Sequence, residues 1–246
     1  QLIHYALPLE SKENPDSWTA VLTEKYAGII LQTASREFTP KILSLLGKSK
    51  IPVIFIDSNY FYKKHPNNIS FLCSDPEACG TKCMNMLIQQ GHKRIAYIRN
   101  EPETDWVHEM SLACHSTAKS ATINYHYLSY SIRSGDDAIF AAKKIVLENL
   151  QLIKEQNITG LVFTSAVGAF AASSLLQENG ISIPAALSIV SCSDSFCAQH
   201  CLPPISVVDY EIDKMSHDAI DIISGKKQKH RKILYPPIEI QRSSIV

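Results

Sequence analysis

Short apolar runs that alternate with longer stretches of helical periodicity constrain the fold of this chain more than any other feature. The runs GIIL, PVIFID, RIAYI and GLVFT are nearly continuous in apolar residues. A strand that is apolar at every position is buried on both faces, as in a parallel sheet covered by helices on both sides. Strands that alternate with helices form parallel βαβ units. The sequence therefore predicts an α/β fold with parallel sheets.

The expected elements follow from this pattern and from local helix signals. Strands are expected at residues 2–7, 28–33, 52–57, 69–73, 94–98, 125–130, 160–164 and 187–191. Helices are expected at residues 39–46, 76–90, 105–118, 136–155, 168–178 and 211–224. Asp75 is placed to cap a helix, with Pro76 at its first position. Gly91, Gly180 and Gly225 are placed to end three of the helices.

Composition excludes several classes of protein. The chain has 24 Lys plus Arg and 24 Asp plus Glu, so it lacks the basic excess that is typical of proteins that bind nucleic acid through phosphates. No apolar run approaches the roughly 18 residues of a membrane span, so we expect no membrane association. Seven cysteines without paired spacing indicate reduced thiols rather than a disulfide framework. We therefore expect a cytoplasmic protein that does not bind DNA by itself.

One group of soft side chains has the composition of a metal site. Cys192, Cys197, His200 and Cys201 form a C-x4-C-x2-H-C pattern that could in principle hold zinc, but the spacing is irregular. The chain has no G-x-S-x-G elbow, no P-loop and no G-x-G-x-x-G turn. We expect no metal, no cofactor and no catalytic activity.

A single strong run of basic residues follows a predicted helix end. Its members are Lys226, Lys227, Lys229, His230, Arg231 and Lys232. Basic residues near a helix C-terminus complement the helix dipole, so a solvated turn is favoured over an anion or nucleic-acid contact.

Several stretches resemble the effector domains of LacI/GalR-type transcriptional regulators. Residues 91–98, with the sequence GHKRIAYI, resemble the GHxRIAxI signature that we expect to close the first lobe. Residues 179–190 resemble the turn between a helix and a strand in the second lobe, and residues 202–209 resemble the P-P-L-T-T-V crossover. His92 and Arg94 are expected to have structural roles, and Pro203-Pro204 is expected to force an extended crossing between lobes.

The resemblance implies two Rossmann-like lobes with parallel sheets and a ligand cleft between them, the periplasmic binding protein-like fold of type I. The expected N-terminal lobe comprises residues 1–99 plus 208–228, and the C-terminal lobe comprises residues 100–207 plus 229–246. Three passes between lobes are expected near residues 99–101, 207–209 and 227–231, with residues 232–241 forming a strand of the C-terminal lobe. The N-terminal DNA-binding head and first strand-helix unit of the family are expected to be absent from this chain.

The resemblance also implies a function. We expect the effector-binding and dimerisation domain of a bacterial LacI-family regulator, in which a small molecule modulates DNA binding by the absent head. The implied partners are an effector of unknown identity, operator DNA through that head, and a second copy in a homodimer, with helix 168–178 as a possible contact. A solute-binding protein of a transport system is the main alternative. A small enzyme using Asp105, His108 or Cys114 is the third hypothesis.

The residues with which the family binds its ligands are replaced in this chain. Its Arg falls on Ser111, its Asn-Asp pair on Ala166-Val167, and its Asp on Ser193, with Asp194 one residue later. Sites that lose charged hydrogen-bonding partners lose affinity for hydroxylated ligands, so common monosaccharides and purine bases should bind weakly.

The expected ligand-binding residues are Trp106, Ser111, Ser165, Ala166, Ser193, Asp194 and Asp57. Ser111, Ala166 and Ser193 stand where the resemblance implies ligand-binding residues, Trp106 follows the expected crossing between lobes, and Ser165, Asp194 and Asp57 lie near predicted strand ends. Trp106 could stack on a ring, although packing is the commoner role of a lone Trp. Thr33, Asn59 and Tyr60 are candidates by topology alone.

Overall fold

The computed structural model describes residues 14–18, 22, 26–32, 40–56, 65–132, 136–230 and 232–246. These residues form an α/β fold built on parallel sheets, as the sequence predicts. The chain divides into two compact units. The first comprises Gln1–Ser74 and Ile212–Tyr235, and the second comprises Asp75–Glu211 and Pro236–Val246.

The first unit has a four-stranded parallel sheet in the order β1-β2-β3-β9. Its strands are β1 (Ile29–Gln32), β2 (Val53–Ile56), β3 (Ile69–Ser74) and β9 (Lys232–Tyr235). Its helical elements are η2 (Pro15–Trp18), α2 (Pro40–Lys48) and α9 (Ile212–Ile223). Phe55 and Phe71 stack at a centroid distance of 4.9 Å in a core that also contains Trp18, Ile42 and Leu46.

The second unit has a six-stranded sheet in the order β10-β8-β7-β6-β4-β5, parallel except for β10. Its strands are β4 (Arg94–Arg99), β5 (Asn124–Ser129), β6 (Gly160–Phe163), β7 (Ser188–Cys192), β8 (Ser206–Asp209) and β10 (Ile238–Ile240). Its helices are α3 (Pro76–Gln89), α4 (Asp105–Ser120), α5 (Ala138–Glu148), α6 (Leu150–Glu155), α7 (Ala166–Glu178) and α8 (Phe196–Gln199).

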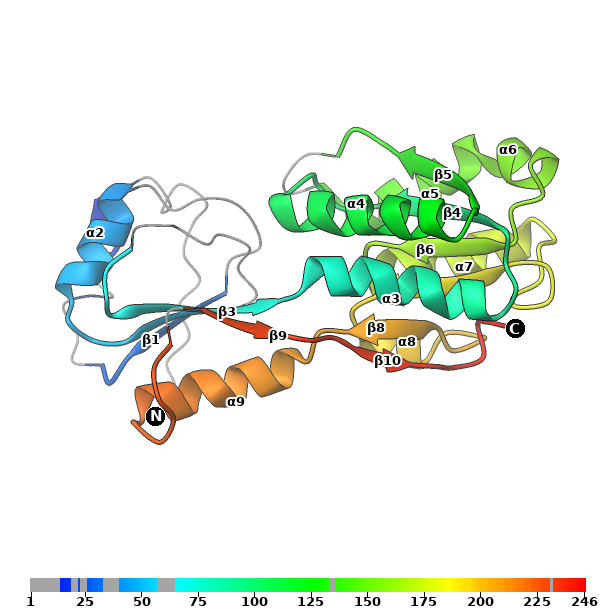
Figure 1. Ribbon diagram of the computed structural model, residues 1–246. Helices are drawn as coiled ribbons and strands as arrows, with labels where there is room; N and C mark the ends of the chain where they lie inside the picture. Colours follow the sequence, from blue (N-terminus) through cyan, green and yellow to red (C-terminus); the bar gives the residue numbers. More distant parts are fainter. Residues whose placement is uncertain are drawn as a thin grey trace. The chain divides into compact units, whose positions relative to one another are not determined.

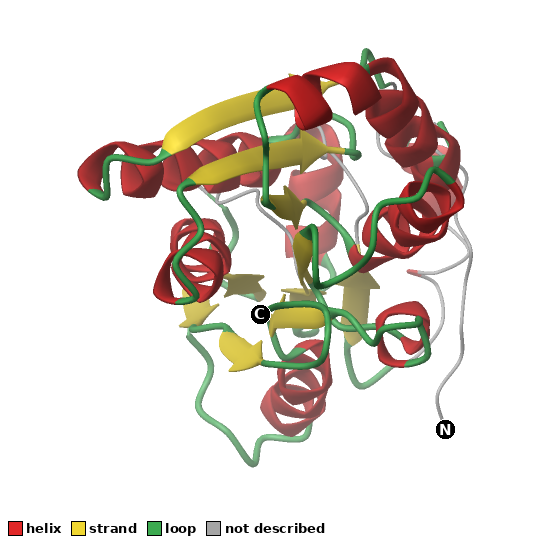
Figure 2. Ribbon diagram, turned by 90° about the vertical axis from the view of Figure 1, so that its right-hand side faces the viewer, coloured by secondary structure: helices red, strands yellow, loops and turns green. Residues whose placement is uncertain are grey.

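Helices cover both faces of this sheet (Figures 1 and 2). Side chains alternate along each strand, so Tyr97 and Val162 pack toward α3 and α4, whereas Ile98 and Phe163 pack toward α5 and α7. Both layers are buried, which explains why these strands are apolar at nearly every position. The helices α3 and α4 approach closely at Gly80, where a Cβ atom would lie 2.4 Å from the Met110 carbonyl oxygen.

Most expected elements are confirmed within two or three residues. The expected strand at residues 2–7 lies outside the described residues. The expected helix at residues 136–155 is interrupted at Asn149, whose side chain donates to the Ile145 carbonyl oxygen at 2.8 Å. The strand β8 and the short helix α8 are not among the expected elements.

The units differ from the expected lobes in their boundaries. The chain changes unit three times, as expected, but it does so after Ser74, Glu211 and Tyr235 rather than near residues 99, 207 and 228. The strand β3 leads directly into α3, and α3 packs on α4 and β7, so α3 belongs to the second unit. The expected strand at residues 232–241 is divided between β9 of the first unit and β10 of the second.

The GHKRIAYI segment therefore does not close the first lobe. It lies inside the second unit, where β4 pairs with β5 and β6. Gly91 has a φ of +91° and follows the end of α3, which is the left-handed position that glycine favours. The His92 ring nitrogen Nδ1 lies 2.9 Å from the Thr159 hydroxyl, and Arg94 Nε donates to the Asn157 carbonyl oxygen at 2.7 Å. These contacts confirm structural roles for both side chains.

Two further segments also differ from their expected roles. Pro203 and Pro204 lie within the second unit and lead into β8, and the chain leaves that unit only after Glu211. Along α7, the small residues Ala169, Ala172 and Ser173 are buried, and the helix packs on α5 and α8.

Two lysines of the basic run after α9 are bonded to other residues of the first unit. Lys227 pairs with Asp218, and Lys229 donates to the Asn67 carbonyl oxygen. Asp218 also accepts from the Tyr235 hydroxyl at 2.5 Å. These contacts agree with a structural turn at the end of a helix.

Candidate ligand-binding site

The carboxyl ends of the central strands in the second unit bring several polar residues to one edge of the sheet. The strands β4, β6 and β7 are parallel and in register, so Asn100, Ser165 and Ser193 follow neighbouring strand ends. Ligands of open α/β sheets bind outside the carboxyl ends of the strands. This edge is therefore the candidate site in the second unit.

Asn100 and Ser165 form the buried base of the edge. Asn100 is fully buried, and its Nδ2 atom donates to the Ser165 hydroxyl at 2.7 Å. The Ser165 backbone N–H donates to Asn100 Oδ1 at 3.4 Å. A Cβ atom on Gly168 would lie 2.1 Å from Asn100 Nδ2, so glycine is required for α7 to begin this close to β4. The result is a rigid amide-hydroxyl pair at the N-terminus of α7.

Glu101 adds a partly buried carboxyl group beside this pair. Burial raises the pKa of Glu101 above its usual 4.5, although a hydrogen bond with Ser165 acts in the opposite direction. A carboxylate that is poorly solvated is stabilised by a cationic partner, and its protonated form can donate a hydrogen bond. The edge therefore offers a carboxyl group whose pKa is raised, so it holds a proton to higher pH than an exposed glutamate does.

Arg99 connects the ends of β4 and β5. Its guanidinium donates to the carbonyl oxygens of Glu101 and Tyr130, each at 3.1 Å, and its Nε atom lies 3.6 Å from a Glu103 carboxylate oxygen. The side chain is nearly buried, so its positive charge interacts with these oxygen atoms of the protein rather than with solvent. This cation holds the loops in place and is already engaged by oxygen atoms.

Trp106 and Ser111 both lie on α4, whose N-cap is Thr104. Trp106 is 8% exposed and packs edge-on against Tyr210 at a centroid distance of 6.0 Å. The Ser111 hydroxyl donates to the His108 carbonyl oxygen one turn earlier. In the second unit, Trp106 therefore packs in the core, and the Ser111 hydroxyl is bonded to its own helix.

Asp194 is held in a network of hydrogen bonds. Arg242 donates to both of its carboxylate oxygens, at 3.0 and 2.7 Å, and the Gln199 amide donates at 2.9 Å. Burial alone would raise the pKa of Asp194, but hydrogen bonds from Arg242 and Gln199 hold that pKa below its usual 3.8. The neighbouring Ser193 has a φ of +65°. The arrangement gives Asp194 a clear role in holding the C-terminal segment to β7.

The expected site residues are thus only partly brought together. Ser165, Ala166 and Ser193 lie at the carboxyl edge of the sheet, where Asn100 and Glu101 join them. Asp57, Thr33, Asn59 and Tyr60 lie outside the described residues. Asn100 and Glu101 were missed, although their position directly after the RIAYI strand was a signal that could have found them.

The irregular Cys/His pattern does not form a cluster. Cys192 is buried in β7, while the His200 ring stacks on Phe196 at 4.1 Å and lies 3.0 Å from the Phe196 carbonyl oxygen. Among the described residues, no three His, Cys, Asp or Glu side chains are placed to hold a metal ion. No helix in the described ranges is long and apolar enough to cross a membrane.

Comparisons with known proteins agree with this fold. Residues 84–245 match the model of the periplasmic binding protein-like domain. The chain is 21% identical over 239 residues to the HTH-type transcriptional repressor PurR of Aliivibrio fischeri, covering 95% of this chain and 69% of the repressor. It is 27% identical over 220 residues to the HTH-type transcriptional regulator GalR of Streptococcus thermophilus, covering 80% of this chain and 59% of that regulator.

A solved structure gives the same result at the level of the fold. A LacI family transcriptional regulator from Enterococcus faecium, with bound ribose, superposes with a TM-score of 0.74 at 20% identity, covering 94% of this chain and 83% of that chain. The expected resemblance to LacI/GalR-type regulators is confirmed by these relatives. The chain belongs to the periplasmic binding protein-like domain family.

Proposed function

We propose that this chain is the effector-binding and dimerisation domain of a bacterial LacI-family transcriptional regulator. The observation on which this depends most is the family match over residues 84–245, which includes every strand of the second unit. The relatives named as HTH-type regulators and the regulator with bound ribose support a domain that binds a small molecule. In such a protein, effector binding changes the population of a DNA-binding state.

The proposed effector site is the carboxyl edge of the sheet in the second unit. Asn100, Glu101 and Ser165 are the groups nearest to a ligand at that edge, with Ala166 and Ser193 as neighbours. Trp106 and Ser111 also belong to the proposed site, in supporting positions on α4. Because the carboxylate of Asp194 is already bonded to Arg242, its part in ligand binding is to hold this edge rather than to grip the ligand.

The proposed partners are operator DNA, reached through a separate DNA-binding head, and a second copy of the chain. The neutral net charge supports DNA contact by a different domain. Phe196 and Leu202 are 74% and 80% exposed, and large apolar side chains with that exposure favour a protein contact. We expect the dimer contact to include this surface, because the small residues of α7 are already buried.

The domain is proposed to be non-catalytic and cytoplasmic. All seven cysteines are free thiols, which is typical of proteins in a reducing compartment. The same observation favours a regulator over the alternative, a solute-binding protein that feeds a transporter. Sequencing the gene upstream of Gln1 separates the two, because a regulator gene encodes a helix-turn-helix segment there and a solute-binding protein gene encodes a signal peptide.

A thermal-shift screen tests the proposed function directly. The panel contains neutral sugars, nucleosides, phosphorylated sugars and small amines. A ligand at 100 times its dissociation constant should raise the stability of the binding unit by about 2.7 kcal/mol. We expect at least one class to raise Tm and common monosaccharides to have little effect, and the absence of any shift across the panel would contradict the proposal.

A further inference from the structure

The short segment of residues 209–211 is the last part of the second unit before the chain enters the first. Asp209 ends β8, which pairs with β7 in the sheet of the candidate site. Tyr210 and Glu211 follow, and the chain then begins α9 of the first unit. The segment is thus one of the three places where the chain passes between the units.

One carboxylate joins this segment to the loop after β7. Asp209 Oδ1 accepts from the Asp194 backbone N–H at 3.2 Å, and Asp209 Oδ2 accepts from the Glu211 backbone N–H at 3.3 Å. The Ser193 backbone N–H donates to the Val208 carbonyl oxygen at 2.9 Å. Because Ser193 and Asp194 follow β7 at the candidate edge, Asp209 contacts that edge with one oxygen and the end of the unit with the other.

The residues on both sides of this carboxylate have an uncommon backbone conformation. Ser193 has a φ of +65°, and Glu211 has a φ of +53°. Three other described non-glycine residues have a positive φ, and each follows the end of a helix, where this conformation is common: Lys50, Thr122 and Asn157. Ser193 and Glu211 do not follow helices. Such residues keep a positive φ only where surrounding contacts hold them, and Asp209 supplies a contact beside each.

Tyr210, in the middle of the segment, is held by α4. Its ring packs edge-on against Trp106 at a centroid distance of 6.0 Å. Trp106 is 8% exposed and is one of the expected ligand-binding residues. The segment is therefore contacted by two elements of the candidate edge, the loop after β7 and the helix α4.

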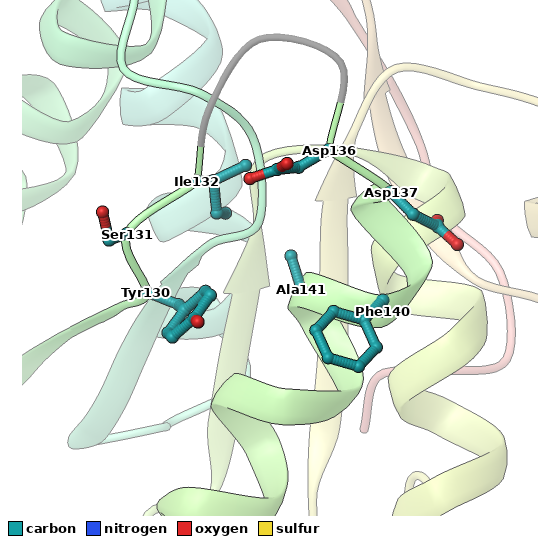
Figure 3. A pocket seen from close by; sticks show the side chains of 7 residues that line it. All are labelled: Tyr130, Ser131, Ile132, Asp136, Asp137, Phe140 and Ala141. Carbon is teal, nitrogen blue, oxygen red and sulfur yellow. The ribbon is translucent and has the colours of Figure 1, made fainter.

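The loops after β4, β5 and β6 are joined to one another and to α5. Arg99 donates to the Tyr130 carbonyl oxygen, and Tyr130 lines a pocket with Phe140 and Ala141 of α5 (Figure 3). The loop after β6 is bonded to the loop after β4 through the Asn100–Ser165 pair. These contacts hold the edge together, whereas Asp209 joins it to the end of the unit.

We propose that Asp209 is a positioning residue, which transmits a change in the loop after β7 to Glu211 at the end of the second unit. This inference rests on the proposed function, because the change to be transmitted is the binding of an effector beside Ser193. Groups in one hydrogen-bond network are energetically coupled. When the Asp194 N–H moves, the carboxylate follows it or releases it, and the bond with Glu211 is altered in both cases.

Amide hydrogen exchange of the whole chain, measured for each residue by NMR, tests this coupling without an effector. Ser193→Val perturbs the loop, because a β-branched side chain strongly disfavours a positive φ. We expect the Glu211 amide to exchange about 3- to 10-fold faster in this variant. The side chain in Asp209→Asn has a single acceptor oxygen and cannot accept from both N–H groups. In that background, Ser193→Val should change the exchange of Glu211 by less than about twofold.

Two further variants complete the test. Asn157→Val is the matched control, because Asn157 also has a positive φ, of +49°, but lies before β6 at the opposite edge of the sheet. It should leave the exchange of Glu211 unchanged. Glu211→Val, measured at the Asp194 amide, is the reciprocal variant, and it should show the same coupling of about 3- to 10-fold. This variant decides the question if Ser193→Val does not fold.

The outcomes separate coupling from a structural role. A merely structural Asp209 would lose protection at the two amides in Asp209→Asn, but Glu211 would not respond to Ser193→Val. An unresponsive Glu211 amide, an equal response with and without Asp209→Asn, or an equal response to Asn157→Val would overturn the inference. Because no effector is used, each of these results leaves the proposed function in place, whereas a failed effector screen contradicts the proposed function alone.

Discussion

Replacing Asp194 by Asn should destabilise the second unit through the loss of one ion pair. Asp194 and Arg242 form two charge-assisted hydrogen bonds, at 3.0 and 2.7 Å, with side chains only 16% and 17% exposed. Two such bonds at about 1.5 kcal/mol each give about 3 kcal/mol, which partial solvent access reduces to about 2 kcal/mol. For a domain of this size, Tm should fall by about 4–8 °C.

Tryptophan fluorescence during urea unfolding measures this loss. The chain has two tryptophans, Trp18 in the first unit and Trp106 in the second. In a Trp18→Phe background, the Trp106 signal reports the second unit alone. Glu178→Gln is the matched control, because Glu178 is exposed at the end of α7.

The result that would refute this reasoning is a loss below about 0.5 kcal/mol, which is the range of an ordinary surface substitution. The pH dependence gives a second check. The pKa of Asp194 is lowered in the folded state, so its contribution is present above pH 3.8 and is lost as the pH falls below that value. The Asp194→Asn variant should lack this loss.

Three further changes have defined outcomes. Burial lowers the pKa of His92 from its usual 6.5, so its contribution to stability is complete above pH 6.5 and is lost as the pH falls below it. His92→Asn should abolish that slope in urea midpoints measured between pH 7 and 5.5, and an unchanged slope would exclude His92. Gly168→Ala should cost about 1–3 kcal/mol, because its Cβ atom would lie 2.1 Å from Asn100 Nδ2, and an unchanged melting curve would contradict this close packing. Phe196→Ser should shift light scattering at tens of micromolar toward monomer, whereas a wild-type protein that is already monomeric would count against the proposed dimer.

Most strands could be predicted from the sequence because each of them is a run of consecutive apolar residues. The run Val53–Ile56 is buried at every position. Such a run identifies a strand that is covered on both faces of its sheet, whichever strands lie beside it. The same property could not show which sheet a strand joins. Residues 95–98 of β4 are as fully buried as β2, so burial could not distinguish their sheets, and the assignment of β4 to the first lobe was wrong.

The site was harder to predict because its contacts join distant parts of the chain. Asp194 is bonded to Arg242, 48 residues later, and no local pattern shows that the carboxylate is already engaged. Asn100 and Ser165 are 65 residues apart and meet only because β4 and β6 are neighbours.

Hydrogen exchange measured with and without ligand tests the central claim, that this domain binds an effector at the carboxyl edge of the second unit. The ligand is the panel compound that raises Tm the most. We predict slower exchange in residues 100–106, 130–141 and 164–168, which follow β4, β5 and β6. Residues 156–159 and 182–187 precede β6 and β7 at the opposite edge and should be unchanged. Protection confined to those two segments, or no protection anywhere in the second unit, would contradict the account.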